Sequence, residues 1–292
     1  MQIENDFLAV KLHPRGAAID NLFIRALNRN VVRTCSDRNA PHHYVNTIVG
    51  PIANRIAGGQ FSIDGNSFTL DMNEGRNTLH GGQIGLSELE WDVVETGKAQ
   101  CAFAIELPDG HMGFPGPSIF KAMYRLNDNS LDVELSAESE RKNAFSLAPH
   151  YYFNLDGSAG IDSHLLQIHA DHYLPVDEDL LPLGRTEPVA ASEFDFLKQR
   201  LIAGTPLDHN FCLNGNGLRE LVILEVDDLN LTIASNQCGV QIFDGRIFNR
   251  EHIAIEPQGW PNAVNVSEFP SQELPAGQSY KSHNRFSFKR IP

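Results

Sequence analysis

Apolar residues alternate with polar ones at a period of two in segment after segment of this chain. The clearest run has its apolar positions at Phe120, Ala122, Tyr124, Leu126, Leu131, Val133 and Leu135. A period of two places side chains on alternate faces of a β-strand. The intervening Asn127-Asp128-Asn129-Ser130 consists of residues that favour turns. This segment is therefore predicted to form a β-hairpin.

Similar alternation recurs along the chain with polar breaks between the runs. The run from Phe61 to Leu70 turns at Asp64-Gly65-Asn66-Ser67, and the run from Val222 to Ile233 turns at Asp227-Asp228, so each is predicted to form a hairpin. The remaining runs are Cys101 to Leu107 and Val240 to Ile242. No long segment keeps a helical period, and the best helical candidate is the short stretch from Ser192 to Arg200, which Ser192 could cap. The pattern predicts an all-β fold of antiparallel sheets, packed as a sandwich or a barrel. Without a linker or an internal repeat, residues 1–292 are expected to form one domain.

The charge balance narrows the choice of partner. The 292 residues include 37 acidic and 23 basic ones, which gives a net charge of −14. Such a chain repels phosphate backbones and anionic membrane surfaces. A nucleic acid or a membrane is therefore not the expected partner, and a neutral or cationic small molecule is favoured.

The cysteine pattern and the N-terminal segment bear on location. The four cysteines are scattered, with no CxxC spacing, which is typical of free thiols in a reducing compartment. The N-terminal segment is charged throughout and no run reaches the length of a membrane span. We expect a cytoplasmic protein.

Polar residues interrupt the alternating runs at places where a core would not need them. In a strand, His150, Tyr152 and Asn154 would share one face while Tyr151 and Phe153 would face the core. A face that is both polar and aromatic suits a sugar or another small ligand, although a solvated strand face explains it equally well.

Glu256 sits in a similar context, opposite the apolar side chains of its own strand. Ile253 and Ile255 would face one side, so Glu256 shares the other with the small Ala254. Pro257 has no N–H to donate, so strand pairing is expected to weaken there. A carboxylate beside a small residue leaves room for a ligand, and a solvated glutamate on an edge strand is the alternative.

Three further segments carry polar residues with two possible explanations each. Arg55 lies among apolar neighbours, either as an edge residue or as a set of donors directed at a ligand. His80 precedes Gly81-Gly82, which permit positive φ and close backbone approach, as in a ligand-facing loop, but a solvated histidine fits too. Asp208 enters a strand and is equally consistent with a turn.

Common catalytic motifs are absent from the sequence. There is no GxGxxG, P-loop, GxSxG or HExxH pattern, so nucleotide, phosphate, serine-nucleophile and zinc-protease chemistry have no support.

Taken together, the polar segments resemble a known family, the aldose 1-epimerases or galactose mutarotases. They occur in the order of that family and cover most of the chain, from about Gly16 to the C-terminus. The matching segments are Ala53-Asn54-Arg55-Ile56, Asn77-Thr78-Leu79-His80-Gly81-Gly82, Gly113-Phe114-Pro115-Gly116, His150-Tyr151-Tyr152-Phe153-Asn154-Leu155, Pro175-Val176-Asp177, Asp208-His209-Asn210-Phe211, and Glu256-Pro257-Gln258 with Pro261 and Asn265.

The resemblance implies a fold, an activity and a set of site residues. The fold would be a large, mostly antiparallel β-sandwich, and the activity would be interconversion of the α and β anomers of a free aldose such as galactose or glucose, without metal or organic cofactor. By resemblance, Glu256 matches the catalytic base and His150 the catalytic acid. Arg55, His80 and Asp208 match residues that bind the sugar or assist the acid. The partner would be a monosaccharide, and the protein a monomer or homodimer.

The chemistry of anomer exchange fits these residue types. Ring opening needs a base for the C1 hydroxyl proton and an acid for the ring oxygen. A glutamate with an ordinary pKa of about 4.3 is ionised at neutral pH, and an imidazole titrates near it. Tyr152 or Trp260 would offer an apolar platform to the sugar.

The sequence departs from the family pattern next to both catalytic positions. Ala148-Pro149 precedes His150 where the family usually has an asparagine before the histidine, and Pro257 replaces the common threonine after Glu256. The stretch from Phe243 to Glu256 is also shorter. These changes affect the rim of the pocket and therefore the preferred sugar. Two other functions remain open: a non-catalytic sugar-binding module, and a glycoside-cleaving enzyme that uses Glu256 and Asp208.

Overall fold

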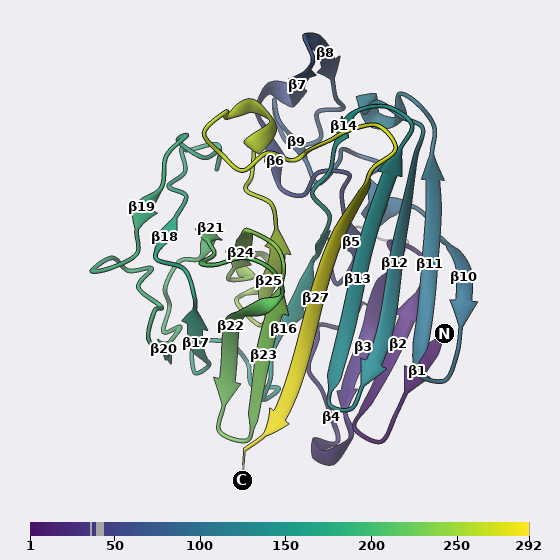
Figure 1. Cartoon of the computed structure of the whole chain (residues 1–292). Helices are drawn as coiled ribbons and strands as arrows, with labels where there is room; N and C mark the ends of the chain where they lie inside the picture. The colour runs from purple at the N-terminus through teal and green to yellow at the C-terminus, as the bar shows by residue number, and fades with distance from the viewer. Residues whose placement is uncertain (36, 39–43, 292) are drawn as a thin grey trace.

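Strands dominate the structure, a computed structural model that describes residues 1–35, 37, 38 and 44–291 (Figure 1). Its helical segments are three-residue 3₁₀ turns, and none in the described part of the chain could cross a membrane. These turns are η1 (Arg25–Leu27), η2 (Ala57–Gly59), η3 (Leu86–Glu88), η4 (His111–Gly113), η5 (Arg246–Phe248) and η6 (Ala263–Asn265).

The largest sheet has nine strands, and every ladder in it is antiparallel. In spatial order they are β10 (Asp92–Thr96), β11 (Gln100–Leu107), β12 (Ser118–Asn127), β13 (Ser130–Ser139), β27 (Ser279–Arg290), β23 (Leu229–Ser235), β22 (Arg219–Val226), β17 (Leu165–Ile168) and β20 (Arg200–Leu201). The predicted hairpins β12–β13 and β22–β23 are confirmed, with turns at the expected polar breaks.

Two further sheets, of six and four strands, complete the main framework. The six-stranded sheet runs β16 (Tyr151–Phe153), β25 (Ile253–Gln258), β24 (Gly239–Phe243), β21 (Asp208–Cys212), β18 (His172–Tyr173) and β19 (Glu187–Pro188). The four-stranded sheet runs β1 (Gln2–Glu4), β2 (Leu8–His13), β3 (Ala18–Ile24) and β4 (Arg29–Asn30).

Four two-stranded ladders join these sheets or extend from them. They pair β14 (Asn143–Ala144) with β26 (Glu273–Leu274), β15 (Ala148–Pro149) with β5 (Ile48–Val49), β6 (Arg55–Ile56) with β9 (Thr78–Leu79), and β7 (Gln60–Ile63) with β8 (Asn66–Thr69). The β7–β8 ladder is the hairpin predicted from the alternation after Phe61.

The sheets pack as a sandwich around one continuous core. Figure 1 shows the four-stranded sheet lying behind β11–β13 of the nine-stranded sheet. Apolar residues of all three larger sheets meet in one buried cluster, for example Val10 of β2, Val133 of β13 and Ile255 of β25. The two layers are also joined by the buried Tyr124 hydroxyl, which donates to the carbonyl of Ala17. The predicted all-β, mostly antiparallel sandwich is thus confirmed.

The predicted helix at Ser192–Arg200 is wrong. The segment forms turns, and Arg200 begins strand β20. Phe194 and Phe196 are both buried in the core, and residues two apart point in nearly opposite directions on a helix. The Ser192 hydroxyl accepts the N–H of Phe194 at 3.1 Å, so it caps a turn instead. Burial of both phenylalanines therefore overrides the weak helical signal.

Strand β25 continues through Pro257, so the predicted weakening there is also wrong on one side. Val240 of β24 pairs with Pro257, and the ladder runs on to Gln258. A proline fits at a position whose N–H points away from the paired strand, and the ladder with β16 on the other side has ended at Ile255. The missing donor therefore breaks no ladder bond.

Candidate active site

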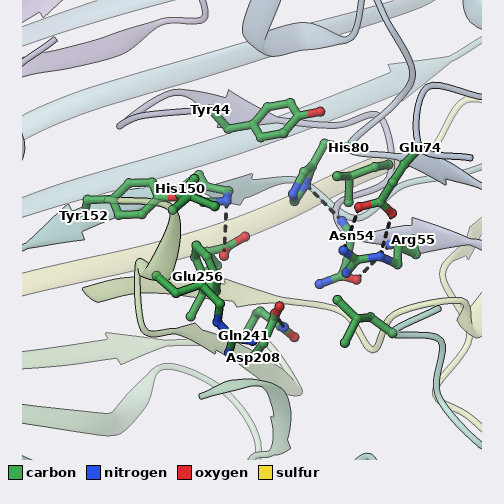
Figure 2. A pocket seen from close by; sticks show the side chains of 15 residues that line it. Tyr44, Asn54, Arg55, Glu74, His80, His150, Tyr152, Asp208, Gln241 and Glu256 are labelled. Atoms are coloured by element: carbon green, nitrogen blue, oxygen red, sulfur yellow. Dashed lines mark hydrogen bonds and ion pairs between the residues drawn. The ribbon is translucent and has the colours of Figure 1, made fainter. Parts of the chain in front are cut away.

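A cavity of about 360 Å³ opens over the face of the six-stranded sheet that points away from the core. Residues from distant parts of the chain line it, and Figure 2 shows ten of them converging. The lining comprises Tyr44, Asn54, Arg55, Glu74, Leu79, His80, His150, Tyr152, Leu180, Asp208, Gln241, Phe243, Arg246, Ile247 and Glu256. All five residues singled out from the sequence are among them.

Cross-strand register places five of these residues on neighbouring strands of the sheet. Glu256 of β25 lies opposite Gln241 of β24, and Phe243 of β24 lies opposite Asp208 of β21. Tyr152 of β16 lies opposite Ala254, which shares the face of Glu256. Because side chains alternate along a strand, β25 directs Ile253 and Ile255 into the core on its other face. The polar face predicted for β25 is therefore the floor of the cavity.

His150 and Glu256 are in direct contact. The imidazole Nε2 lies 3.3 Å from Oε1 of Glu256, and both side chains are almost fully buried (Figure 2). His150 sits between β15 and β16, where its backbone N–H donates to Thr47 and its carbonyl accepts from Asn46. The ring of Tyr152 stacks on the imidazole at a centroid distance of 5.1 Å. An imidazole and a carboxylate are thus held in contact with little exposure to solvent.

Burial changes the acid–base character of Glu256. The residue is only 2% exposed, and this burial raises its pKa well above the ordinary value. The nearby Asp208 carboxylate raises the pKa further, while Arg55 opposes the rise. Its Oε2 atom is buried and has no donor among the residues that the structure describes. The sequence-based expectation of an ordinary ionised glutamate is therefore corrected: this carboxylate holds its proton more strongly and is a better base once ionised.

Asp208 lies at the same end of the cavity, held by an amide. Its Oδ1 accepts a hydrogen bond of 2.8 Å from Nε2 of Gln241, the neighbour of Glu256 on the sheet. Burial also raises the pKa of Asp208, with Arg55 and the Gln241 hydrogen bond opposing the rise. The alternation around Val240 and Ile242 was a signal for Gln241, since it put this polar residue on the face opposite the core.

His80 is held in one tautomer by backbone. The N–H of Asn54 donates to Nδ1 of His80 at 3.1 Å, and the His80 N–H donates to the Asn54 carbonyl at 3.1 Å. Nδ1 is therefore an acceptor, and the neutral ring carries its hydrogen on Nε2. Burial, His150 and Arg55 lower the pKa of His80 well below the ordinary value. His80 is consequently a neutral hydrogen-bond donor at physiological pH.

The loop after His80 needs its glycines. Gly81 has a φ of +93°, and a Cβ atom there would lie 2.1 Å from the carbonyl oxygen of Gly50. The predicted close approach of backbone at this loop is confirmed. His80 is thereby fixed against the segment that follows β5.

The cluster of His80, His150 and Glu256 does not suit a metal ion, although ligand atoms of all three lie within 4.8 Å of one another. A metal-binding histidine offers a lone pair and usually donates its other N–H to an acceptor. In His80 the backbone donor at Nδ1 imposes the reverse arrangement. These residues are better suited to hydrogen bonding than to metal coordination.

Arg55 makes a two-point ion pair that the sequence did not reveal. Its Nε and Nη2 donate to Oε2 and Oε1 of Glu74 at 2.7 and 2.8 Å. Glu74 lies in a turn just before the segment that begins at Asn77, outside every motif and alternating run, so no local signal marked it. Tyr44, packed on His80 at a centroid distance of 4.5 Å, was missed for the same reason.

Two residues expected near a ligand lie elsewhere. Trp260 packs against Phe269 in a separate cluster and donates to the Cys238 carbonyl. Asn154 donates to the carbonyls of Ser158 and Glu251. Tyr152 lines the cavity, so it is the aromatic platform that the structure retains.

Comparisons with known proteins identify the family of this chain. A family model described as aldose 1-epimerase matches residues 1–287. Galactose mutarotase of Sus scrofa is 34% identical over 275 residues, covering 85% of this chain and 79% of that protein. Aldose 1-epimerase of Haemophilus influenzae is 31% identical over 293 residues, covering 89% and 86%.

Solved structures show the same relationship. An aldose epimerase homologue from C. elegans superposes with a TM-score of 0.94 at 25% identity, covering 100% of this chain and 99% of that one. Galactose 1-epimerase from Lactobacillus acidophilus gives a TM-score of 0.89 at 27% identity, covering 100% and 94%. With a family match across almost its whole length, this chain belongs to the aldose 1-epimerase family.

Proposed function

We propose that this chain is a mutarotase that interconverts the α and β anomers of a free aldose, with Glu256 as base and His150 as acid. The direct contact between these two side chains on the cavity floor is the observation that carries the proposal. Family membership supports the reaction, and the geometry supports the assignment of the residues.

The reaction moves two protons and breaks one bond. Glu256 takes the proton of the C1 hydroxyl, the C1–O5 bond breaks, and His150 gives its proton to O5. The open-chain aldehyde then rotates about C1–C2. For closure, His150 takes back the proton from the O5 hydroxyl, O5 attacks C1 from the other face, and Glu256 returns its proton to the C1 oxygen. Both groups end in their starting states.

The burial of the pair suits this exchange. The raised pKa of Glu256 brings its proton affinity closer to that of an imidazole and of the C1 hydroxyl from which it takes a proton. His80 offers a fixed N–H, and Asp208 offers a buried acceptor to sugar hydroxyls. Charge-assisted hydrogen bonds of the Asp208 type contribute about 1.5–3 kcal/mol each. The substrate is proposed to be a monosaccharide such as galactose or glucose, and the names of the relatives, galactose mutarotase and aldose 1-epimerase, support a free aldose.

The test follows the relaxation of freshly dissolved α-glucose and α-galactose by polarimetry or by NMR exchange between anomers. We expect the protein to shorten the relaxation time relative to buffer alone. Binding of the sugar with an unchanged relaxation time would contradict the proposal and indicate a binding module. Release of aryl alcohol from aryl glycosides would indicate glycoside cleavage instead.

A further inference from the structure

We propose that Glu74 is a positioning residue of this site, which holds the guanidinium of Arg55 from the side and directs its remaining N–H groups into the cavity. The inference rests on the proposed function, because it concerns how Arg55 meets a sugar. It assigns a role to a residue outside the five that the sequence marked.

The carboxylate of Glu74 binds one edge of the Arg55 guanidinium. Glu74 occupies Nε and Nη2 of Arg55 with both carboxylate oxygens. Within the described part of the chain, Nη1 has no protein acceptor, and the Arg55 side chain is only 10% exposed. Two parallel bonds fix the plane of a guanidinium, which a single bond would not do. Nη1 is therefore left for a ligand in the cavity (Figure 2).

Glu74 is itself held by the strand pair that carries Arg55. Backbone bonds in both directions close the turn from Glu74 to Asn77, at 3.2 and 2.9 Å. The Asn77 side chain accepts the N–H of Gly58, just after β6. The turn leads directly into β9, where Leu79 pairs with Arg55. The short path between the two partners means that their relative position is set by one small ladder.

Competition among carboxylates explains why such a residue is needed. Arg55 lies close enough to Asp208 and Glu256 to lower the pKa of both. A guanidinium without a partner of its own would turn toward these acceptors, and an arginine side chain has about 2 kcal/mol of rotamer entropy to restrict. Glu74 satisfies Arg55 from the outer side of the cavity. Asp208 and Arg55 can then contact the sugar separately rather than each other.

The experiment compares Glu74→Gln with Arg76→Gln, two variants of the same turn. Arg76 pairs with Asp179 at 2.7 Å, but the two side chains are 75% and 46% exposed and Arg76 is not part of the cavity lining. We expect Glu74→Gln to raise KM about tenfold with kcat changed less than about threefold, as for the loss of a charge-assisted contact. Arg76→Gln should leave both constants near wild type, as is typical of exposed pairs.

A double-mutant cycle separates positioning from a general structural role. In an Arg55→Met background, Glu74→Gln should cause no further rise in KM, because its effect passes through the guanidinium. Arg55→Lys provides a second background, since lysine cannot make two parallel bonds. Glu74→Asp keeps a carboxylate, so its KM should lie between that of wild type and that of Glu74→Gln.

Two results would overturn the assignment. One is an equal rise in KM on adding Glu74→Gln to wild type and to both Arg55 backgrounds. The other is a rise for Arg76→Gln as large as that for Glu74→Gln. If the wild-type protein does not accelerate anomer exchange, the proposed function fails. The same cycle measured on the Kd for galactose or glucose by NMR titration then decides the role of Glu74 independently.

Discussion

The two faces of strand β25 alternate residue by residue, and they differ in what they contact: one packs in the apolar core and the other lines the cavity. Ile253 and Ile255 are fully buried among apolar side chains of the sandwich core. Glu256 is almost as buried, yet it contacts the imidazole of His150, lies near the carboxylate of Asp208, and has one oxygen without a donor among the described residues. The first face stabilises the fold through removal of apolar surface from water. The second carries a desolvation cost that does not stabilise the fold, which is typical of a functional site.

The comparison shows why burial alone does not distinguish core from site. The side chains on both faces are buried, but on one side the sheet meets a second layer of apolar side chains and on the other it meets a cavity. Polar groups in a site are expected to be poorly satisfied until a ligand arrives. The following variants test whether the two faces can be separated experimentally.

The largest effect is expected for Glu256→Gln, which removes the base with little change of shape. Anomer exchange should slow by about 10²–10⁴-fold, the usual contribution of general acid–base catalysis. Polarimetry measures this loss. A variant with full activity would refute the assignment of the base.

The same variant should be more stable than wild type at neutral pH. The folded pKa of Glu256 is raised above its unfolded value, so the folded state binds more protons in the interval between them. The stability that protonation provides is present below the unfolded pKa and is lost as pH rises toward the folded pKa. A neutral glutamine avoids this cost, and each kcal/mol gained raises Tm by about 2–4 °C. Calorimetry at pH 7 and pH 4 should show the gain shrinking at the lower pH.

Ile255→Ala, on the neighbouring residue, should show the reverse pattern. Deleting a fully buried isoleucine side chain costs about 2–5 kcal/mol of the free energy of unfolding. Denaturant titration measures this loss, and kcat of the folded protein should remain near wild type. A large drop in kcat without a loss of stability would mean that the two faces are not independent.

Asp208→Asn should produce a smaller, two-part effect. Loss of the negative charge lowers the pKa of Glu256, because Asp208 is among the groups that raise it. Activity needs ionised Glu256, so the acid limb of the kcat/KM profile should move to lower pH. Loss of a charge-assisted acceptor should also raise KM by about tenfold or more. An acid limb that stays in place or moves to higher pH would contradict the electrostatic coupling.

Tyr152→Phe should have the smallest effect. The ring stacks on His150 and faces the cavity, and these contacts do not use the hydroxyl. We expect kcat and KM within about twofold of wild type, as for a substitution that preserves packing. Tyr152→Ala is the control, and it should lose activity because the imidazole loses its support.

Much of the local structure could be predicted because it depends on neighbours in sequence. Alternation alone placed Tyr151 and Ile255 on core-facing positions and Tyr152 and Glu256 opposite them. Turn residues located the hairpins. The helix expected at Ser192–Arg200 failed because two buried phenylalanines outweigh local propensity.

The site was predictable only in its residue types. Short motifs marked Arg55, His80, His150, Asp208 and Glu256, and the fold placed all five in one cavity. Glu74 escaped because an exposed-looking glutamate in a turn carries no periodic signal. Trp260 was misplaced because an aromatic near a motif need not point toward it.

The sequence by itself determined which residues alternate, where the chain turns and which side chains can exchange protons. The tertiary structure alone decided that His150 contacts Glu256, that Glu74 pairs with Arg55, and that burial raises the pKa of Glu256. The reason is physical. Strand faces follow from the backbone geometry of adjacent residues, whereas contacts between distant strands and the dielectric around a carboxylate exist only once the layers have packed.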